Sequence, residues 1–318
     1  MPALRDDATV VLVARLYYEE QLSQAAVAEK LHLSRPSVSR ILAQARDRGI
    51  VEISIHDPGG SSRRDPDLEG ALLERFGMSA AIVVKGPHAG DLDRVSRAAA
   101  DVLSGRLRNV ASIGVSWGKT MQSVVERLPA LTLRPVPRVL PLVGGLSALD
   151  QLESGDSVLR VLASKIGAVA EPLFAPAVLG SPLAHAALMD EVSIRGVLDE
   201  AAKVDLALVG IGSIGLHSNP HLVAGMRLTP EETREFRAQG PVGDLCGRFV
   251  DAEGNSLGAP SADRIVAVDF ESLRKIPDVI GVAAGAEKAP GVGGVLRSGV
   301  VDTVVVDAAL AKAVLASA

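Results

Sequence analysis

The sequence has little cysteine, few aromatic side chains and no long apolar run, and each shortage excludes a class of protein. Cys246 is the only cysteine among the 318 residues, so the chain forms neither an internal disulfide nor a zinc site built from several cysteines. No stretch reaches about 18 uninterrupted apolar residues, as a transmembrane helix requires, and the first residues are acidic, unlike a signal peptide. We expect a cytoplasmic protein in which Cys246 is a small buried apolar residue.

The composition favours an α/β protein with a small additional module. The chain is 47% hydrophobic but only 3% aromatic, and this richness in Ala, Val, Leu and Gly is typical of proteins with buried parallel strands. Its length suits a small module joined to a domain of roughly 250 residues. The net charge of −5 argues against a protein that coats nucleic acid through its overall charge.

Residues 1–56 predict a helix-turn-helix module. The apolar residues of "VVLVARLY" have the i, i+3, i+4, i+7 spacing of an amphipathic helix. Ser23 and Ser34 suit the N-caps of a second and a third helix, and Gly49 ends the third. The alternating "IVEISIH" at residues 50–56 predicts a short strand that closes the module.

The third helix combines an apolar face with a basic, hydroxyl-rich face. Val38, Ile41 and Leu42 fall on one side, whereas arginine and serine occupy the other. Arginine can donate two hydrogen bonds to a guanine edge, and the local charge acts within a screening length of about 10 Å despite the acidic chain. A solvated face on a protein-binding bundle is the alternative. We expect the DNA contacts to come from Gln24, Ser34, Arg35, Ser37, Ser39, Arg40 and Gln44.

A second domain is predicted at residues 68–318, after a linker at residues 57–67 that is rich in Pro, Gly and Ser. Apolar strands alternate there with helical segments, which predicts an α/β fold with a mainly parallel sheet covered on both faces. The expected strands are 80–84, 110–115, 138–143, 204–212, 264–270, 279–284 and 303–307.

The segment "SIGVSWGKTMQSVVERL" at residues 112–128 runs from a strand through a glycine turn into a helix. Such a junction directs free N–H groups and the positive helix end at one point, which suits a phosphate. An ATPase P-loop is an alternative, but Ile113 stands where its first glycine should be. An ordinary structural turn is a third interpretation.

Glycines and charged residues follow several other predicted strands, and the carboxyl ends of parallel strands share one edge of a sheet. We therefore expect one crevice that binds an effector. Its predicted residues are Ser116, Trp117, Gly118, Lys119, Thr120, Gly144, Gly145, Gly210, Gly212, Asp244 and Lys288.

No cofactor, metal site or catalytic group is expected. His217 and His221 have a spacing that could bind metal on a helix, but Asn219 and Pro220 between them disfavour that helix. We recognise no Ser/His/Asp group and no paired carboxylates.

The ordered blocks of the chain resemble the SorC family of bacterial sugar-binding transcriptional regulators. They are the N-terminal "LSQAAVAEKLHLSRPSVSRILAQARDRGIVEISI", then "GVSWGKTM", "LPLVGG", "DLALVGIGS", "GPVGDLCGRFVDAEG" and "IPDVIGVAAGAEKAPGV". The resemblance implies an effector domain related in fold to ribose-5-phosphate isomerase, glucosamine-6-phosphate deaminase and CoA transferases, and a homotetramer on DNA. In members that respond to phosphorylated autoinducer-2, the Asp of "GDL" and the Lys of "AEK" contact the ligand, which implies the same for Asp244 and Lys288.

The chain departs from the family pattern at two places. The helix that follows the family's lysine should be interrupted here by Pro290, Gly291, Gly293 and Gly294. Near the C-terminus, Val306 replaces a hydroxyl residue, so we expect no polar contribution to the pocket from that position.

These features together predict a DNA-binding transcriptional regulator of carbohydrate metabolism. Its partners would be a double-stranded operator and a phosphorylated sugar or polyol, with no membrane. One alternative is a sugar-phosphate isomerase or deaminase with an added DNA-binding module, in which the Lys288 amine forms a Schiff base. Another is a protein-binding scaffold without affinity for DNA.

Overall fold

The computed structural model describes residues 7–18, 20, 22–47, 50–51, 64–86, 90–146, 155–214 and 220–317. Within these ranges, nothing is stated of the side chains at positions 7, 8, 46, 47, 109, 155, 220 and 221. The chain divides into two compact units, Met1–Gly60 and Ser61–Ala318. Most of the strand predicted at 50–56, most of the linker predicted at 57–67, and Gly49 lie outside the described residues.

The described residues of the N-terminal unit form three helices, α1 (Asp7–Tyr18), α2 (Gln24–Lys30) and α3 (Arg35–Asp47). Ser23 caps α2 by accepting a hydrogen bond from the backbone N–H of Ala26, as the sequence predicts. Ser34 does the same at the start of α3, where its Oγ accepts from the N–H of Ser37 at 3.3 Å. Apolar residues from all three helices form one small core, whose members include Val13, Val27 and Val38.

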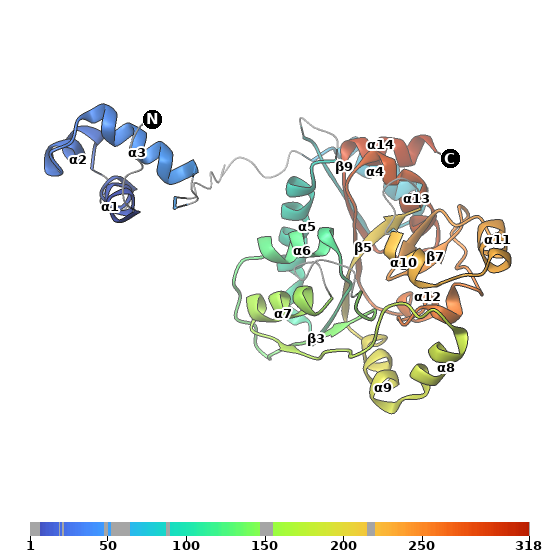
Figure 1. Ribbon diagram of the computed structural model, residues 1–318. Helices are drawn as coiled ribbons and strands as arrows, with labels where there is room; N and C mark the ends of the chain where they lie inside the picture. The colour runs from blue at the N-terminus through green and yellow to red at the C-terminus, as the bar shows by residue number, and fades with distance from the viewer. Residues whose placement is uncertain are drawn as a thin grey trace. The chain divides into compact units, whose positions relative to one another are not determined.

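In the described part of the larger unit, nine strands are covered by helices (Figure 1). The strands are β1 (Ala80–Val84), β2 (Ser112–Val115), β3 (Arg138–Pro141), β4 (Val169–Ala170), β5 (Leu206–Ser213), β6 (Gly243–Leu245), β7 (Arg248–Val250), β8 (Val279–Val282) and β9 (Thr303–Asp307). The helices are α4 (Pro66–Phe76), α5 (Leu92–Arg106), α6 (Lys119–Arg127), α7 (Gly155–Ile166), α8 (Pro182–Asp190), α9 (Val192–Ala201), α10 (Pro220–Gly225), α11 (Pro230–Ala238), α12 (Phe270–Leu273), α13 (Ala289–Arg297) and α14 (Ala308–Ala316), with short 3-10 turns η1 (Leu107–Asn109), η2 (Ala262–Arg264) and η3 (Ala286–Lys288).

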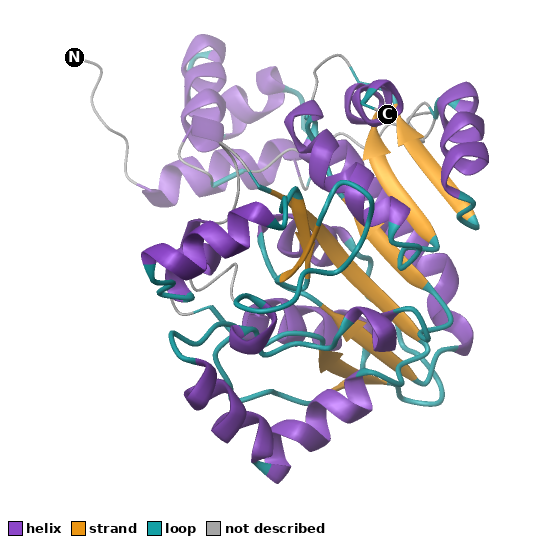
Figure 2. Cartoon of the chain, turned by 90° about the vertical axis from the view of Figure 1, so that its right-hand side faces the viewer, coloured by secondary structure: helices purple, strands orange, loops and turns teal. Residues whose placement is uncertain are grey.

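The main sheet has the strand order β1-β9-β8-β5-β2-β3-β4, and every neighbouring pair along it is parallel. The strands run side by side between helical layers (Figure 2). Strands β6 and β7 form an antiparallel hairpin, and β6 also pairs antiparallel with the end of β5. The mainly parallel α/β fold expected from the sequence is confirmed. Because all main strands point the same way, their carboxyl ends share one edge.

Alternate residues of the strands supply two cores on opposite faces of the sheet. Helices α5, α6 and α7 cover one face, where Val95, Val124 and Leu162 pack on strand residues such as Ile113. Helices α4, α9, α13 and α14 cover the other face, with strand residues such as Val304. Both faces are therefore closed to water, which explains why the strands read as continuous apolar runs.

The predicted end of the linker and one predicted strand differ from the structure. Helix α4 begins at Pro66, so the linker predicted to reach residue 67 is too long: Asp65 caps the helix through the N–H of Leu68, and proline suits the first turn. Residues 264–270 form isolated bridges at Ile265 and Ala267 in place of a strand. The segment ends early because Asp269 accepts from the N–H of Ser272 and starts α12 at Phe270.

The helix predicted to be interrupted after Lys288 is intact. Helix α13 runs from Ala289 to Arg297 through three glycines. A Cβ at Gly291 would lie 2.4 Å from the carbonyl oxygen of Gly212, so glycine is required for the helix to approach the end of β5. Close packing against the sheet outweighs the low intrinsic helix propensity of glycine.

Candidate DNA-binding surface and effector crevice

The N-terminal half of α3 carries an exposed polar surface. Arg35, Ser39 and Arg40 are exposed, whereas Val38, Ile41 and Leu42 are buried against α1 and α2. Ser34 is exposed just before the helix, and Ser37 and Gln44 are partly exposed, as is Gln24 at the start of α2. All seven residues predicted to contact DNA thus lie on accessible positions of the second and third helices of the unit.

Arg40 is partly anchored by its own helix. Its Nε donates to the carbonyl oxygen of Pro36 at 3.3 Å. Among the described residues, its two terminal nitrogens have no protein partner. A guanidinium held at Nε with both terminal nitrogens available has the geometry for a bidentate bond to a base edge.

In the larger unit, the β2–α6 junction is built as the sequence predicts. Gly118 has a φ of 111°, which favours glycine, and it is the N-cap of α6. No atom lies within 4 Å of the position that a Cβ would occupy there, so a ligand can approach this backbone. Lys119 is exposed and Thr120 is half-buried in the first turn of α6, where helix N–H groups are unpaired.

Ser116 and Trp117 hold this junction in place. The Ser116 Oγ accepts from the N–H of Gly210 at 3.1 Å, which ties the end of β2 to β5. The Trp117 Nε1 donates to the carbonyl oxygen of Gly144 at 2.7 Å, which ties the same loop to the end of β3. These two residues position the loop, and the half-buried indole remains partly exposed beside it.

The backbone N–H groups of Gly144 and Gly145 form hydrogen bonds within the protein. A Cβ at Gly144 would lie 2.5 Å from the carbonyl oxygen of Pro176, so the close neighbour is the chain itself. The N–H of Gly144 donates to Val266, and the N–H of Gly145 donates to Ala175. Both N–H groups are therefore occupied within the protein, as is that of Gly210, and these glycines shape the strand ends without offering donors to a ligand.

Asp244 and Lys288 come together from distant parts of the sequence. Asp244 is on β6 directly opposite Gly212 of β5, and a Cβ at Gly212 would lie 2.0 Å from the Asp244 Oδ1. Lys288 ends η3, which contacts β5, while α13 packs on both β5 and β6. The absence of a side chain at Gly212 thus makes room for the carboxylate.

The two groups are electrostatically linked. Burial raises the pKa of Asp244 to about 6, against the opposing effects of the Gly247 N–H and of Lys288. Burial lowers the pKa of Lys288, while Glu287, Asp244 and Asp307 oppose the shift. Yet the described contacts include no ion pair between Asp244 and Lys288. An acid and an amine that lie near each other without being paired could both bond to one molecule, such as a hydroxylated anion.

Asp307 has a structural role that sequence reasoning did not assign. Its Oδ2 accepts from the N–H of Gly285 at 2.7 Å, and its Oδ1 accepts from the N–H groups of Ala309 and Leu310. It therefore anchors the loop that leads to Lys288. A carboxylate with three backbone donors is not positioned as the magnesium ligand that a P-loop enzyme would need. Val306, where the family has a hydroxyl, is buried in the core.

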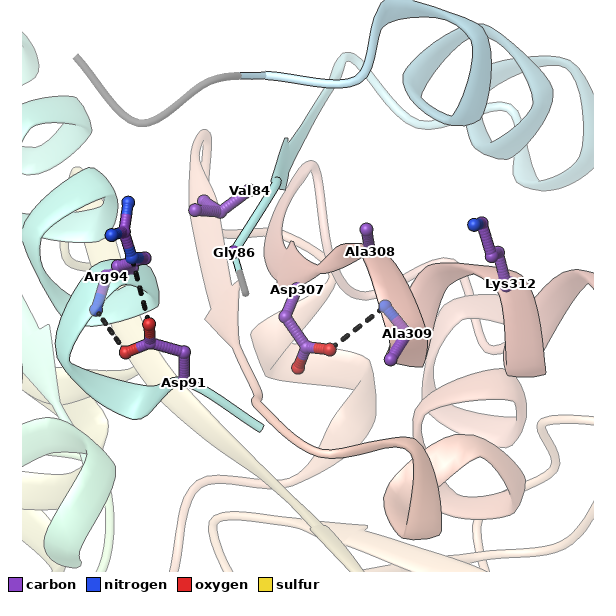
Figure 3. Close-up of a pocket in the computed structure, with 8 residues that line it drawn as sticks. All are labelled: Val84, Gly86, Asp91, Arg94, Asp307, Ala308, Ala309 and Lys312. Carbon is purple, nitrogen blue, oxygen red and sulfur yellow. Dashed lines mark hydrogen bonds and ion pairs between the residues drawn. The ribbon is translucent and has the colours of Figure 1, made fainter. Parts of the chain in front are cut away.

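A cavity of about 230 Å³ lies farther along the same edge, at the ends of β1 and β9 (Figure 3). It is bordered by Lys312, by Asp307 and by Arg94, whose Nε pairs with Asp91 at 2.9 Å. None of the residues predicted for the effector site lines it.

Comparisons with known proteins find relatives that match both the N-terminal unit and the larger unit. Residues 62–316 match the family model described as "Putative sugar-binding domain". The chain belongs to the SorC family of sugar-binding transcriptional regulators. Within this family, the chain is similar to the sorbitol operon regulator of Klebsiella pneumoniae, at 28% identity over 96% of this chain and 97% of that protein. It is also 28% identical to the deoxyribonucleoside regulator of Bacillus subtilis (strain 168), over 95% of each chain.

The likeness extends to three dimensions. The crystal structure of the full-length sorbitol operon regulator SorC from Klebsiella pneumoniae matches with a TM-score of 0.73 at 28% identity, and covers 98% of this chain and 99% of that chain. The match therefore includes the N-terminal unit as well as the sugar-binding unit.

No described helix is long and apolar enough to span a membrane. No cluster of three or more His, Cys, Asp or Glu side chains suited to a metal ion occurs in the described part of the chain, and the His217 and His221 side chains lie outside it.

Proposed function

We propose that this SorC family regulator binds an operator through α3 and senses a phosphorylated sugar or polyol in the crevice between α6 and Lys288. The phosphate would lie at the N-terminus of α6, beside Gly118, Lys119 and Thr120. The hydroxyl groups would reach Asp244 and Lys288. The main support is that the same chain carries both parts. Helix α3 exposes basic side chains, and residues 62–316 match the sugar-binding family model.

Effector binding and operator binding must be thermodynamically coupled if the effector is to regulate transcription. An effector changes DNA affinity only if the DNA-bound arrangement binds that effector differently, and typical couplings are about 1 to 3 kcal/mol. A palindromic operator would be read by two copies of the chain with half-sites spaced by helical turns, and we propose a homotetramer on DNA. Such a regulator would act in the cytoplasm.

Thermal-shift measurements on the full chain test the effector site. Pentose and hexose phosphates should raise the melting temperature at concentrations where the corresponding free sugars do not, because a ligand that binds only the native state stabilises it. Asp244→Ala and Lys288→Ala should each abolish the shift. If free sugars raise the melting temperature as much as their phosphates do, the proposed phosphate site at the N-terminus of α6 is wrong. If both variants respond normally, the effector binds elsewhere.

We propose no enzymatic activity, although the lowered pKa of Lys288 would also suit an amine that forms a Schiff base. The discriminating assay incubates the chain with the phosphates that raise its melting temperature. Recovery of each compound unchanged supports the regulator, and turnover that is lost in Lys288→Ala would establish the isomerase or deaminase alternative.

A further inference from the structure

The proposed function does not use the cavity at the ends of β1 and β9 (Figure 3). Its volume of about 230 Å³ is many times the roughly 10 to 15 Å³ that one water molecule needs. Two helices begin at its border, α5 after Asp91 and α14 after Asp307. The cavity therefore has room for a small molecule beside two helix N-termini, which carry partial positive charge.

The two carboxylates at the border already accept hydrogen bonds from the protein. Asp307 accepts from the N–H groups of Gly285, Ala309 and Leu310. One oxygen of Asp91 accepts from the N–H of Arg94 at 3.2 Å, and the other pairs with the Arg94 Nε at 2.9 Å. Each carboxylate is thus engaged as a helix cap, which disfavours a bound cation.

The two basic side chains at the border have unpaired donors. Arg94 uses its Nε for Asp91, but its two terminal nitrogens have no partner in the part of the chain that the structure describes. Lys312, on the second turn of α14, is exposed and forms no ion pair with any described residue. In Figure 3 these two side chains flank Val84 and Gly86.

The charges just outside the cavity do not occupy these donors. Lys85 follows Val84, and its Nζ lies 3.3 Å from the Asp65 Oδ2. Asp65 is also within electrostatic reach of Lys312, although these two described residues form no ion pair. The ammonium of Lys312 is therefore free to bind a ligand.

Unpaired donors beside engaged acceptors favour an anion over a cation or a neutral sugar. Arginine donates from a planar fork and lysine from a compact ammonium, and both bind phosphate oxygens. An anion between Arg94 and Lys312 accepts best if its oxygens point in several directions. The oxygens of a tetrahedral phosphate do so, whereas those of a carboxylate lie on one side.

We propose that this cavity is a second anion site, which binds a phosphate group that is either free phosphate or part of a small metabolite. We call it the α5–α14 site. It is separate from the effector crevice, because no residue predicted for that crevice borders it. Asp307 links the two, since it borders the cavity and holds the N–H of Gly285, where the turn that carries Lys288 begins. The inference does not rest on the proposed function.

Calorimetric titration of the full chain with inorganic phosphate tests the α5–α14 site. Sodium chloride keeps the ionic strength constant, so that general screening cancels. The titration uses Lys119→Glu, which places a carboxylate at the start of α6 and repels phosphate from the proposed effector crevice. One phosphate per subunit should still bind. Arg94→Gln or Lys312→Gln should weaken its binding at least about tenfold, as expected for the loss of one charge-assisted hydrogen bond.

Two controls make the same changes of charge away from the cavity. Arg97→Gln removes a guanidinium that pairs with Asp93 on α5. Lys275→Gln removes an ammonium that pairs with Glu271 on α12. Both should leave phosphate binding unchanged. The melting temperatures of all four variants should stay close to that of the parent, because the substituted side chains are largely exposed.

A second pair of variants fills space and keeps every charge. Ala308→Leu enlarges a half-buried side chain at the border of the cavity, so it should also weaken phosphate binding about tenfold or more. Ala316→Leu makes the same change at the exposed far end of α14 and should leave the binding unchanged.

Glycerol phosphate, titrated in the same way, identifies the source of the phosphate group. Tighter binding than that of inorganic phosphate would indicate a phosphorylated metabolite. Equal or weaker binding would indicate free phosphate.

Two results would overturn the proposal. One is a Lys119→Glu chain that binds no phosphate. The other is binding that survives Arg94→Gln combined with Lys312→Gln. If the parent binds phosphate and Lys119→Glu abolishes all of it, the result supports the proposed phosphate site at α6 and contradicts the α5–α14 site, so the two proposals can fail independently.

Discussion

The indole Nε1 of Trp117 donates to the carbonyl oxygen of Gly144 at 2.7 Å, and this bond joins the loops that follow two neighbouring strands, β2 and β3. It places the only tryptophan of the chain beside the Gly118 turn, where the sequence predicts the phosphate.

We therefore expect effector binding to change the fluorescence of Trp117. Sugar phosphates that raise the melting temperature should shift or quench the emission with the same midpoint, because the half-buried indole adjoins their site. Trp117→Phe should remove the signal and cost about 1 kcal/mol of folding free energy in urea titrations through the lost hydrogen bond. Saturating ligand without any change in emission would place the effector away from β2.

Arg40→Ala should weaken binding to a selected operator by about 1 to 3 kcal/mol, measured by fluorescence anisotropy, if the guanidinium reads a guanine. Arg40→Lys keeps the charge and loses the bidentate geometry, so it should lose most of the same discrimination. Equal losses on operator and scrambled DNA would show that Arg40 contacts only phosphate.

Asp244→Asn should stabilise the chain near neutral pH. The native state holds the Asp244 proton more tightly than the unfolded chain does, since burial raises the pKa from 3.8 to about 6. Stability therefore falls as pH rises through this window, by on the order of 1 to 3 kcal/mol at completion. The variant avoids this loss, and asparagine can still accept from the Gly247 N–H.

Urea unfolding of parent and Asp244→Asn across pH 4 to 8 provides the measurement. The difference in unfolding free energy should grow between about pH 4 and pH 6 and then stay level. A difference that does not vary with pH would mean that Asp244 titrates normally.

Two glycines in α13 should respond to alanine in opposite directions. A Cβ at Gly291 would lie 2.4 Å from the Gly212 carbonyl oxygen, so Gly291→Ala must displace the helix from β5 and should cost about 1 to 3 kcal/mol. At Gly293 the nearest atom is the flexible end of Arg297 at 3.2 Å, so Gly293→Ala should gain up to about 1 kcal/mol. Chemical unfolding of both variants checks this, and equal effects would refute the packing argument.

Much of the fold follows from local sequence patterns. The strands predicted at 80–84 and 303–307 match β1 and β9 because continuous apolar runs can only be buried in a covered parallel sheet. The caps at Ser23 and Ser34 follow from hydroxyls placed before helical segments. Cys246 is buried, as we expect for a small apolar side chain.

The features that the sequence analysis missed depend on unusual turn residues or on contacts between distant segments. The β6–β7 hairpin was missed because its turn uses Cys246 and Gly247, with φ of 53° and 77°, where Asn-Gly is the usual signal. The continuity of α13 depends on the neighbouring carbonyl of Gly212, which no local propensity reveals. The sequence also does not reveal that the N–H groups of Gly144 and Gly145 donate to the carbonyl oxygens of Val266 and Ala175, which lie 30 or more residues away.

Anisotropy of a labelled operator, titrated with the full chain with and without a sugar phosphate that raises its melting temperature, tests the central claim most directly. We expect the effector to change operator affinity about 5- to 150-fold in the parent, and to change nothing in Asp244→Ala or Lys288→Ala, which should still bind the operator. The account would be contradicted if the effector left the operator affinity of the parent chain unchanged. It would also be contradicted if the chain had no affinity for DNA at low salt.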